Sequence, residues 1–115
     1  MNFDEAIQAH VQWKMKLRQH LGGAQKFDAG VVGKDDQCVL GKWIHGEAST
    51  KYRQLPDYAK LKAAHASFHA TAASVIRTHD SGLGVKAAEL LEGLYEKASL
   101  EVVHHIRHIR KVIEG

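Results

Sequence analysis

The sequence predicts an all-α protein, an antiparallel four-helix bundle-like domain with three long helices and one short helix that carries the only cysteine. Three long segments repeat apolar residues at steps of three and four, a spacing that places them on one face of a helix. Alternating runs typical of strands are scarce, and the single proline, Pro56, suits the first residue of a helix. Helices joined by modest loops pack as antiparallel neighbours.

The first predicted helix begins after Asn2 and ends at Gly22 and Gly23. Asn2 is a suitable N-cap, and glycines are common just past the end of a helix. Lys14 interrupts the apolar stripe of this helix, and His10 belongs to it, so that His10 is expected to point toward the core. The stripe consists of Phe3, Ile7, His10, Leu17 and Leu21.

A loop without periodicity follows, from Gly22 to about Gln37, and it has room for a further short turn. The next segment, residues 38–44, is long enough for about two helical turns. Asp35 and Asp36 are plausible caps for this short helix. Cys38 would then lie near a helix N-terminus, where the helix dipole favours a thiolate.

The third helix is predicted to begin at Pro56, and the chain breaks again between Asp80 and Gly84. The stripe of the third helix is Tyr58, Leu61, His65, Phe68, Ala72, Val75 and His79. The last helix is predicted from near Val85 almost to the end of the chain. Its inner stripe is Ala87, Leu91, Leu94, Ala98, Val102, His105, Ile109 and Val112.

Length and composition indicate a single domain over residues 1–115, in a reducing cytoplasm because no internal disulfide can form. No segment resembles a signal peptide or a membrane span, so we expect no membrane partner. The net charge is +3, and the densest basic stretch lies near the C-terminus around Arg107, Arg110 and Lys111. We interpret this stretch as a solvated helix end and expect no nucleic-acid partner.

Histidine is unusually frequent, with nine in the chain. His65 and His69 lie four residues apart, so that both imidazoles leave the same face of one helix. A lone histidine on an apolar stripe is more often a hydrogen-bonded core residue than a ligand. Together with His10 and Cys38, however, the pair makes a complete tetrahedral ligand set, and its mixed nitrogen and sulfur donors favour Zn²⁺. If the first and third helices run antiparallel, His10 and His65 can lie at one level.

The other histidines are assigned simpler roles. We expect His20, His45 and His104 to face solvent, and His108 to belong to the basic end. His79 lies on an apolar stripe and is expected to be a core or interface residue, or a hydrogen-bond donor behind the ligands; the same holds for His105.

Enzymatic classes fit poorly, and we predict no catalytic residues. A Cys–His nucleophile needs a cleft and an oxyanion hole, and a di-iron bundle needs several inward carboxylates. No phosphate-binding loop or dinucleotide fingerprint is present. Metal-dependent hydrolysis needs an open coordination position, which four protein ligands leave no room for.

Several motifs resemble the chemoreceptor zinc-binding domain, the CZB family. The most specific is Cys-x-x-Gly-x-Trp within residues 37–44, Gln-Cys-Val-Leu-Gly-Lys-Trp-Ile. The remaining matches, in the same order as in the family, are His10-x-x-Trp13, Lys51-Tyr52, Leu55-Pro56 and His65-x-x-x-His69.

The resemblance implies a regulatory domain of bacterial chemoreceptors or diguanylate cyclases, with zinc held by His10, Cys38, His65 and His69. It also implies a homodimer and, in some members, a zinc-bound cysteine that responds to hypochlorous acid. No signalling or cyclase domain lies within these 115 residues, so the chain is either free-standing or an excised domain, and its effector stays open.

We therefore predict a zinc-binding sensor domain, not an enzyme, with Cys38 as its redox-sensitive residue. Oxidation of the cysteine toward sulfenic acid would remove a strong donor from the metal. The residues leave open whether the signal is zinc or an oxidant. The alternative is a structural, zinc-stabilised helical dimerisation or interaction module without a sensing role.

Overall fold

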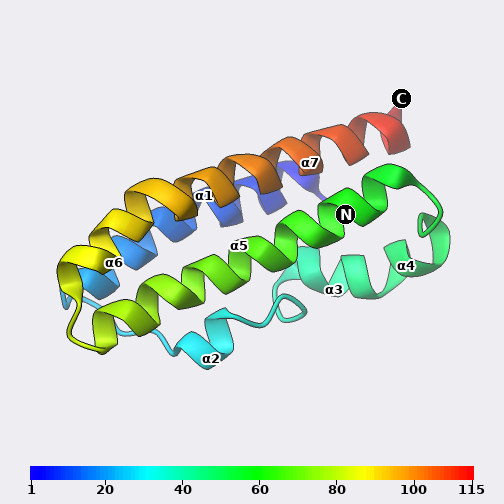
Figure 1. The fold of residues 1–115 in the computed structure, drawn as a ribbon. Coiled ribbons are helices and arrows are strands. Elements are labelled where there is room, and N and C mark those ends of the chain that lie inside the picture. Colours follow the sequence, from blue (N-terminus) through cyan, green and yellow to red (C-terminus); the bar gives the residue numbers. More distant parts are fainter.

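All 115 residues are described in the computed structural model, which contains helices and no strands (Figure 1). The long helical runs are α1 (Phe3–Leu21), α5 (Pro56–Asp80) and a continuous run of α6 (Gly84–Leu90), η1 (Leu91–Tyr95) and α7 (Glu96–Glu114). Short helices α2 (Ala29–Val32), α3 (Val39–His45) and α4 (Glu47–Lys51) connect α1 to α5. The predicted fold class is confirmed. None of the helices combines the length and apolarity needed to span a bilayer.

Each long segment of the chain runs antiparallel to the segment before it (Figure 1). The short helices α2, α3 and α4 together make up the segment between α1 and α5. Helices α1 and α5 are therefore parallel. His10 lies against His65 and His69, and ten residues further along α1, His20 contacts Asp80. The expectation that the first and third helices run antiparallel, which would bring His10 and His65 to one level, is wrong. The two levels coincide because both helices begin at the same end of the bundle.

Ion pairs join α1 to the last helical run and explain the lysine in the apolar stripe. Lys14 pairs with Glu92 at 3.4 Å and also with Glu96, and Asp4 pairs with Arg110 at 2.6 Å. Asp4, near the start of α1, pairs near the end of the last helical run, whereas Lys14, further along α1, pairs nearer the start of that run. This order shows that the two are antiparallel. Lys14 therefore marks the border of the packed face.

A π-helical turn, η1, changes the core-facing stripe of the last run. Such a turn shifts the helical phase of everything that follows it. Leu94, predicted to face inward, is 62% exposed, and Tyr95 is buried in its place. Val112 is also exposed, whereas Ile106 is fully buried. The predicted stripe is thus wrong at Leu94, where the π-turn interrupts the α-helical period, and at Val112, next to which Ile113 packs against the core instead.

The connection between α1 and α5 contains the short helix predicted around the cysteine. Cys38 is its N-cap, and the Sγ atom accepts a hydrogen bond from the backbone N–H of Gly41 at 3.3 Å. The prediction that Asp35 and Asp36 cap this helix is wrong. Asp35 instead lies 3.3 Å from His45, near the other end of the same helix.

Aromatic packing fixes α3 against the two parallel helices. The Trp43 ring meets the Phe3 ring of α1 edge-on, with 5.4 Å between their centroids. From α5, the Tyr58 hydroxyl donates a hydrogen bond to the carbonyl of Ile44 at 2.8 Å. Ile44 itself is fully buried. The helix that begins at Cys38 is therefore held from both sides.

Gly41 is a steric requirement of this arrangement. A Cβ atom at this position would lie 1.8 Å from the carbonyl oxygen of Asp35, because the preceding loop crosses directly over the helix. Such a contact forces backbone to move, and the nearest structure to move is the turn that holds Cys38.

We expect Gly41→Ala to weaken zinc binding by more than about tenfold, since the displaced loop carries the thiol away from its partners. Zinc affinity can be measured by competition with a chromophoric chelator. The matched control is Gly93→Ala, where a Cβ atom meets nothing within 4 Å. This control should keep wild-type affinity and gain up to about 1 kcal/mol of helix stability. Equal affinities for the two variants would contradict the steric role of Gly41.

Candidate metal centre

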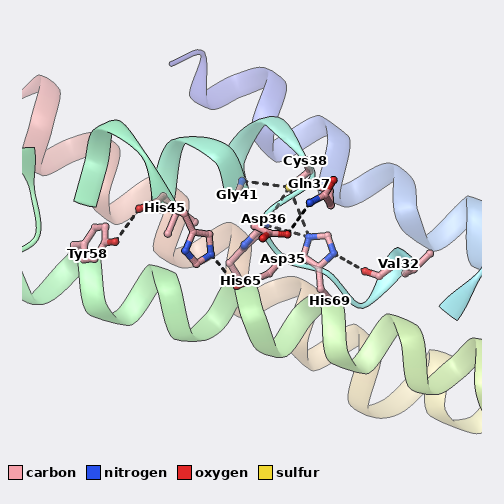
Figure 2. A network of polar contacts seen from close by, with 11 residues as sticks. Val32, Asp35, Asp36, Gln37, Cys38, Gly41, His45, Tyr58, His65 and His69 are labelled. Carbon is pink, nitrogen blue, oxygen red and sulfur yellow. Dashed lines mark hydrogen bonds and ion pairs between the residues drawn. The ribbon is translucent and has the colours of Figure 1, made fainter. Parts of the chain in front are cut away.

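The four residues predicted as metal ligands come together in the middle of the bundle. One ligand atom from each of His10, Cys38, His65 and His69 lies within 4.8 Å of all the others. The three histidines are buried, and the cysteine is half-buried. Figure 2 shows His65 and His69 rising from α5 toward Cys38 at the start of α3. Helix α1 supplies His10.

The spacing of the ligand atoms fits a tetrahedral ion. The Cys38 Sγ atom lies 3.3 Å from His65 Nε2 and 3.7 Å from His69 Nε2, and these two nitrogens are 3.1 Å apart. Usual zinc bond lengths in a tetrahedron give about 3.3 Å between nitrogens and about 3.6 Å from nitrogen to sulfur. The three side chains thus need to move by only a few tenths of an ångström.

Backbone carbonyls orient two of the imidazoles. His10 Nδ1 donates a hydrogen bond to the Ala6 carbonyl at 2.7 Å, and His69 Nδ1 donates to the Val32 carbonyl at 2.8 Å. With the proton held at Nδ1, the Nε2 lone pair of each ring faces the centre. This is the usual arrangement behind metal-bound histidines. The sequence could reveal the Ala6 contact through its helical spacing, but nothing in it signals Val32.

Two buried nitrogens have no hydrogen-bond partner, His10 Nε2 and His65 Nδ1. A buried polar atom without a partner costs about 1–3 kcal/mol. A cation among the ligand atoms would satisfy His10 Nε2. The His65 ring lacks an orienting carbonyl, and it is positioned by the His69 ring, with 4.5 Å between their centroids. The donor set therefore fits a metal ion better than it fits an apolar core.

Burial keeps the three imidazoles neutral. It lowers the pKa of His10 and His69, and it lowers the pKa of His65 to about 2. The neighbouring histidines add to the lowering at His65, since a charged ring there would face other positive charges. Neutral imidazoles offer their lone pairs to a metal without competition from protons.

The pKa of the cysteine shifts in the opposite direction, and burial again favours the neutral form. Burial raises the pKa of the Cys38 thiol, and the Gly41 N–H opposes this rise only in part. The expectation that the start of α3 favours a thiolate is therefore wrong for the protein without metal. A thiolate at Cys38 needs the positive charge of a bound ion.

A second histidine cluster lies where α1 and α5 end. His20, predicted to face solvent, is only 3% exposed, and that prediction is wrong. Its Nε2 lies 2.8 Å from Asp80, which also contacts His79 at 3.0 Å, and its Nδ1 accepts the N–H of Phe27 at 3.0 Å. Since Nδ1 is an acceptor, the proton is on Nε2 and is donated to Asp80. We interpret this cluster as a set of hydrogen bonds that joins the ends of α1 and α5, and not as a metal site. Metal binding at His20 Nε2 would require the proton to be at Nδ1, which instead accepts the N–H of Phe27.

The remaining histidines lie away from the centre. His45 and His104 are exposed, as predicted. His79 contacts Asp80 and lies ten residues beyond His69 on the same helix, about 15 Å along it, so it does not orient the ligands. His105 is partly buried on α7.

An all-α fold with three neutral imidazoles and one thiol around a common point defines a helical metal-binding domain, with donors typical of zinc. A family model, the chemoreceptor zinc-binding domain, matches residues 10–76, which is more than half of the chain. The chain therefore belongs to the chemoreceptor zinc-binding domain family. A search of curated proteins and a search of solved structures gave no match.

Zinc is the cofactor that the family and the donor set both support. The match includes every residue of the centre, from His10 to His69. It also contains Trp13 and the Cys-x-x-Gly-x-Trp element, in which Gly41 has the steric role described above. When bound, the ion supplies the charge that holds the Cys38 sulfur as a thiolate.

At pH 7 we expect zinc binding to release about one proton, because the zinc-free thiol is protonated and the three imidazoles are already neutral. Affinity should accordingly rise about tenfold per pH unit between pH 6 and 8. Calorimetric titrations in two buffers of different ionisation enthalpy measure the released protons.

The matched control is Cys38→Asp, which offers an anionic ligand and a suitable N-cap at the same position. Because its carboxylate is already ionised at pH 7, zinc binding to this variant should release no proton. Equal proton release from the two proteins would contradict the assignment of the proton to Cys38.

Proposed function

We propose that this chain is a regulatory zinc-binding sensor domain without catalytic activity, and that His10, Cys38, His65 and His69 hold the ion. The observation that carries the proposal is the convergence of four ligand atoms within 4.8 Å in the bundle interior. Membership of the chemoreceptor zinc-binding domain family supports it. Four protein ligands complete a tetrahedron, whereas catalytic zinc keeps one position for water or substrate.

We propose further that the signal enters at Cys38, as zinc availability, as an oxidant such as hypochlorous acid, or as both. The thiolate sulfur attacks the chlorine of HOCl, and the sulfenyl chloride formed is hydrolysed by water. The net reaction is R–S⁻ + HOCl → R–SOH + Cl⁻, in which sulfur loses two electrons and chlorine gains them. Sulfenic acid is a poorer ligand than thiolate, so the affinity of the site for zinc falls.

The consequence for the fold follows from the double role of the sulfur. Cys38 Sγ also caps α3 through the N–H of Gly41. Loss of this cap costs about 1 kcal/mol of helix stability. Movement of Cys38 away from His65 and His69 would therefore loosen α3 and the loop before it. A local element with two states is what a sensor needs.

The proposed partners are a second copy of the chain and a signalling protein of the chemoreceptor or diguanylate cyclase class. Apolar side chains on the two terminal helices support the homodimer: Val11 and Met15 on α1 and Leu100 on α7 are exposed. Large contiguous apolar patches are typical of protein contact surfaces.

We expect purified protein to contain close to one zinc per chain and the double variant Cys38→Ala, His65→Ala to contain almost none, because only two ligands remain. Elemental analysis after dialysis measures the ratio. His104→Ala, at an exposed histidine, is the control and should keep its zinc. Zinc that persists in the double variant would rule out the assigned site.

Hypochlorous acid at one or two equivalents should displace zinc from the wild type, since sulfur is the only readily oxidised ligand. The measurement is zinc release to a chromophoric indicator. Cys38→Asp, which lacks the sulfur, should retain its zinc under the same treatment. If both proteins retain zinc, the oxidant branch fails and sensing of zinc itself becomes the remaining proposal.

A structural zinc in an interaction module is the second candidate, and the burial of all three histidine ligands favours it. Under this alternative, chelation unfolds the bundle outright. Under the sensor proposal, the zinc-free protein keeps most of its helix and loses order around α3. Circular dichroism with and without chelator, together with hydrogen exchange at residues 35–46, distinguishes the two.

A further inference from the structure

Two surface hollows adjoin the metal centre, and Cys38 lines both of them. The first is lined by residues that include Phe27, Val32 and His69, and the second by residues that include His10 and Leu40. Three residues line both hollows and so form their common wall: Trp13, Gln37 and Cys38. A reagent that occupies either hollow therefore meets a wall that contains both Trp13 and Cys38.

The Trp13 ring is held in place by two neighbours. Its centroid lies 5.5 Å from that of Phe27, which approaches edge-on, and the Lys16 ammonium lies 4.6 Å from the ring. Trp13 is three residues after His10 and so projects from nearly the same face of α1. This position is consistent with the place of Trp13 in the lining of both hollows that contain Cys38.

The sulfur itself is only partly covered. Cys38 is half-buried, and the hydrogen bond from Gly41 fixes the direction of its Sγ atom. Access then depends on the size of the reagent. A molecule of two heavy atoms passes the edge of an indole, whereas an aromatic disulfide must bring a ring and two aligned sulfur atoms up to the thiolate.

We propose that Trp13 is a specificity-determining residue, which admits small neutral oxidants to Cys38 and holds back bulky thiol reagents. The inference rests on the proposed function, because it concerns the same sulfur. It adds the class of reagent that the centre accepts. Trp13 acts here by position and does not take part in the reaction.

The test compares zinc-loaded wild-type protein with Trp13→Ala, using two neutral reagents of different size. Hypochlorous acid oxidises the thiolate to sulfenic acid and is reduced to chloride. 4,4′-Dithiodipyridine reacts as R–S⁻ + PyS–SPy → R–S–SPy + PyS⁻, so that a sulfur–sulfur bond forms, another breaks and a coloured thiolate leaves. Stopped-flow absorbance gives both rates, with zinc release recorded in parallel.

Trp13→Ala should react with the aromatic disulfide at least about tenfold faster than wild type, because access limits this exchange. Its rate with hypochlorous acid should stay close to that of wild type. Trp13→Phe, which keeps a ring, should behave like wild type. The matched control is Gln8→Ala on the same helix, where the side chain is exposed and lines neither hollow.

Two results would overturn the proposal: an unchanged disulfide rate in Trp13→Ala, or an equal acceleration with both reagents. The second would mean that the indole stabilises the centre as a whole, and melting temperatures and zinc content report this directly. If hypochlorous acid fails to release zinc from the wild type, the proposed oxidant sensing is contradicted. The disulfide rates, which need no oxidation by hypochlorous acid, still decide the role of Trp13.

Discussion

The bundle is organised around one electrostatic constraint: three neutral imidazoles and one thiol meet in its interior, with their ligand atoms within 4.8 Å of one another. Nε2 atoms of His65 and His69 lie 3.1 Å apart, and that of His10 has no partner at all. Such an arrangement is unfavourable without a central positive charge, since desolvated lone pairs face one another. The parallel course of α1 and α5 and the return of the chain through α3 both serve to bring these donors to one point.

Much of this organisation is visible in the sequence, because helical periodicity identifies which residues face inward. His10, His65 and His69 were located on inner stripes, and the short helix was located around Cys38. Periodicity carries no direction, however, so the same stripes fit parallel or antiparallel neighbours. The connection between α1 and α5 makes these two helices parallel, because it crosses the full length of the bundle before α5 begins.

Other features were not predictable for equally physical reasons. The π-turn η1 shifts the helical phase, and a pattern read with a single period places Leu94 where Tyr95 belongs. His20 is buried through contacts with Asp80, which is 60 residues away in the sequence. At the metal centre, the side chains were predictable, but their orientation was not. It depends on backbone groups, such as the Val32 carbonyl, that carry no signature of residue type.

The sulfur of Cys38 belongs to two equilibria, since it accepts the Gly41 N–H at the start of α3 and lies among the imidazoles of α5. Thermodynamic linkage makes such coupling reciprocal. If occupancy of the centre favours the ordered state of α3 by a given factor, then the ordered state of α3 binds zinc more tightly by that same factor. A contact that stabilises α3 therefore raises zinc affinity until α3 is fully ordered without the metal. The Trp43–Phe3 contact is one such point, although it lies outside the ligand set. Related domains can thus be tuned to different zinc concentrations by changes in aromatic packing alone.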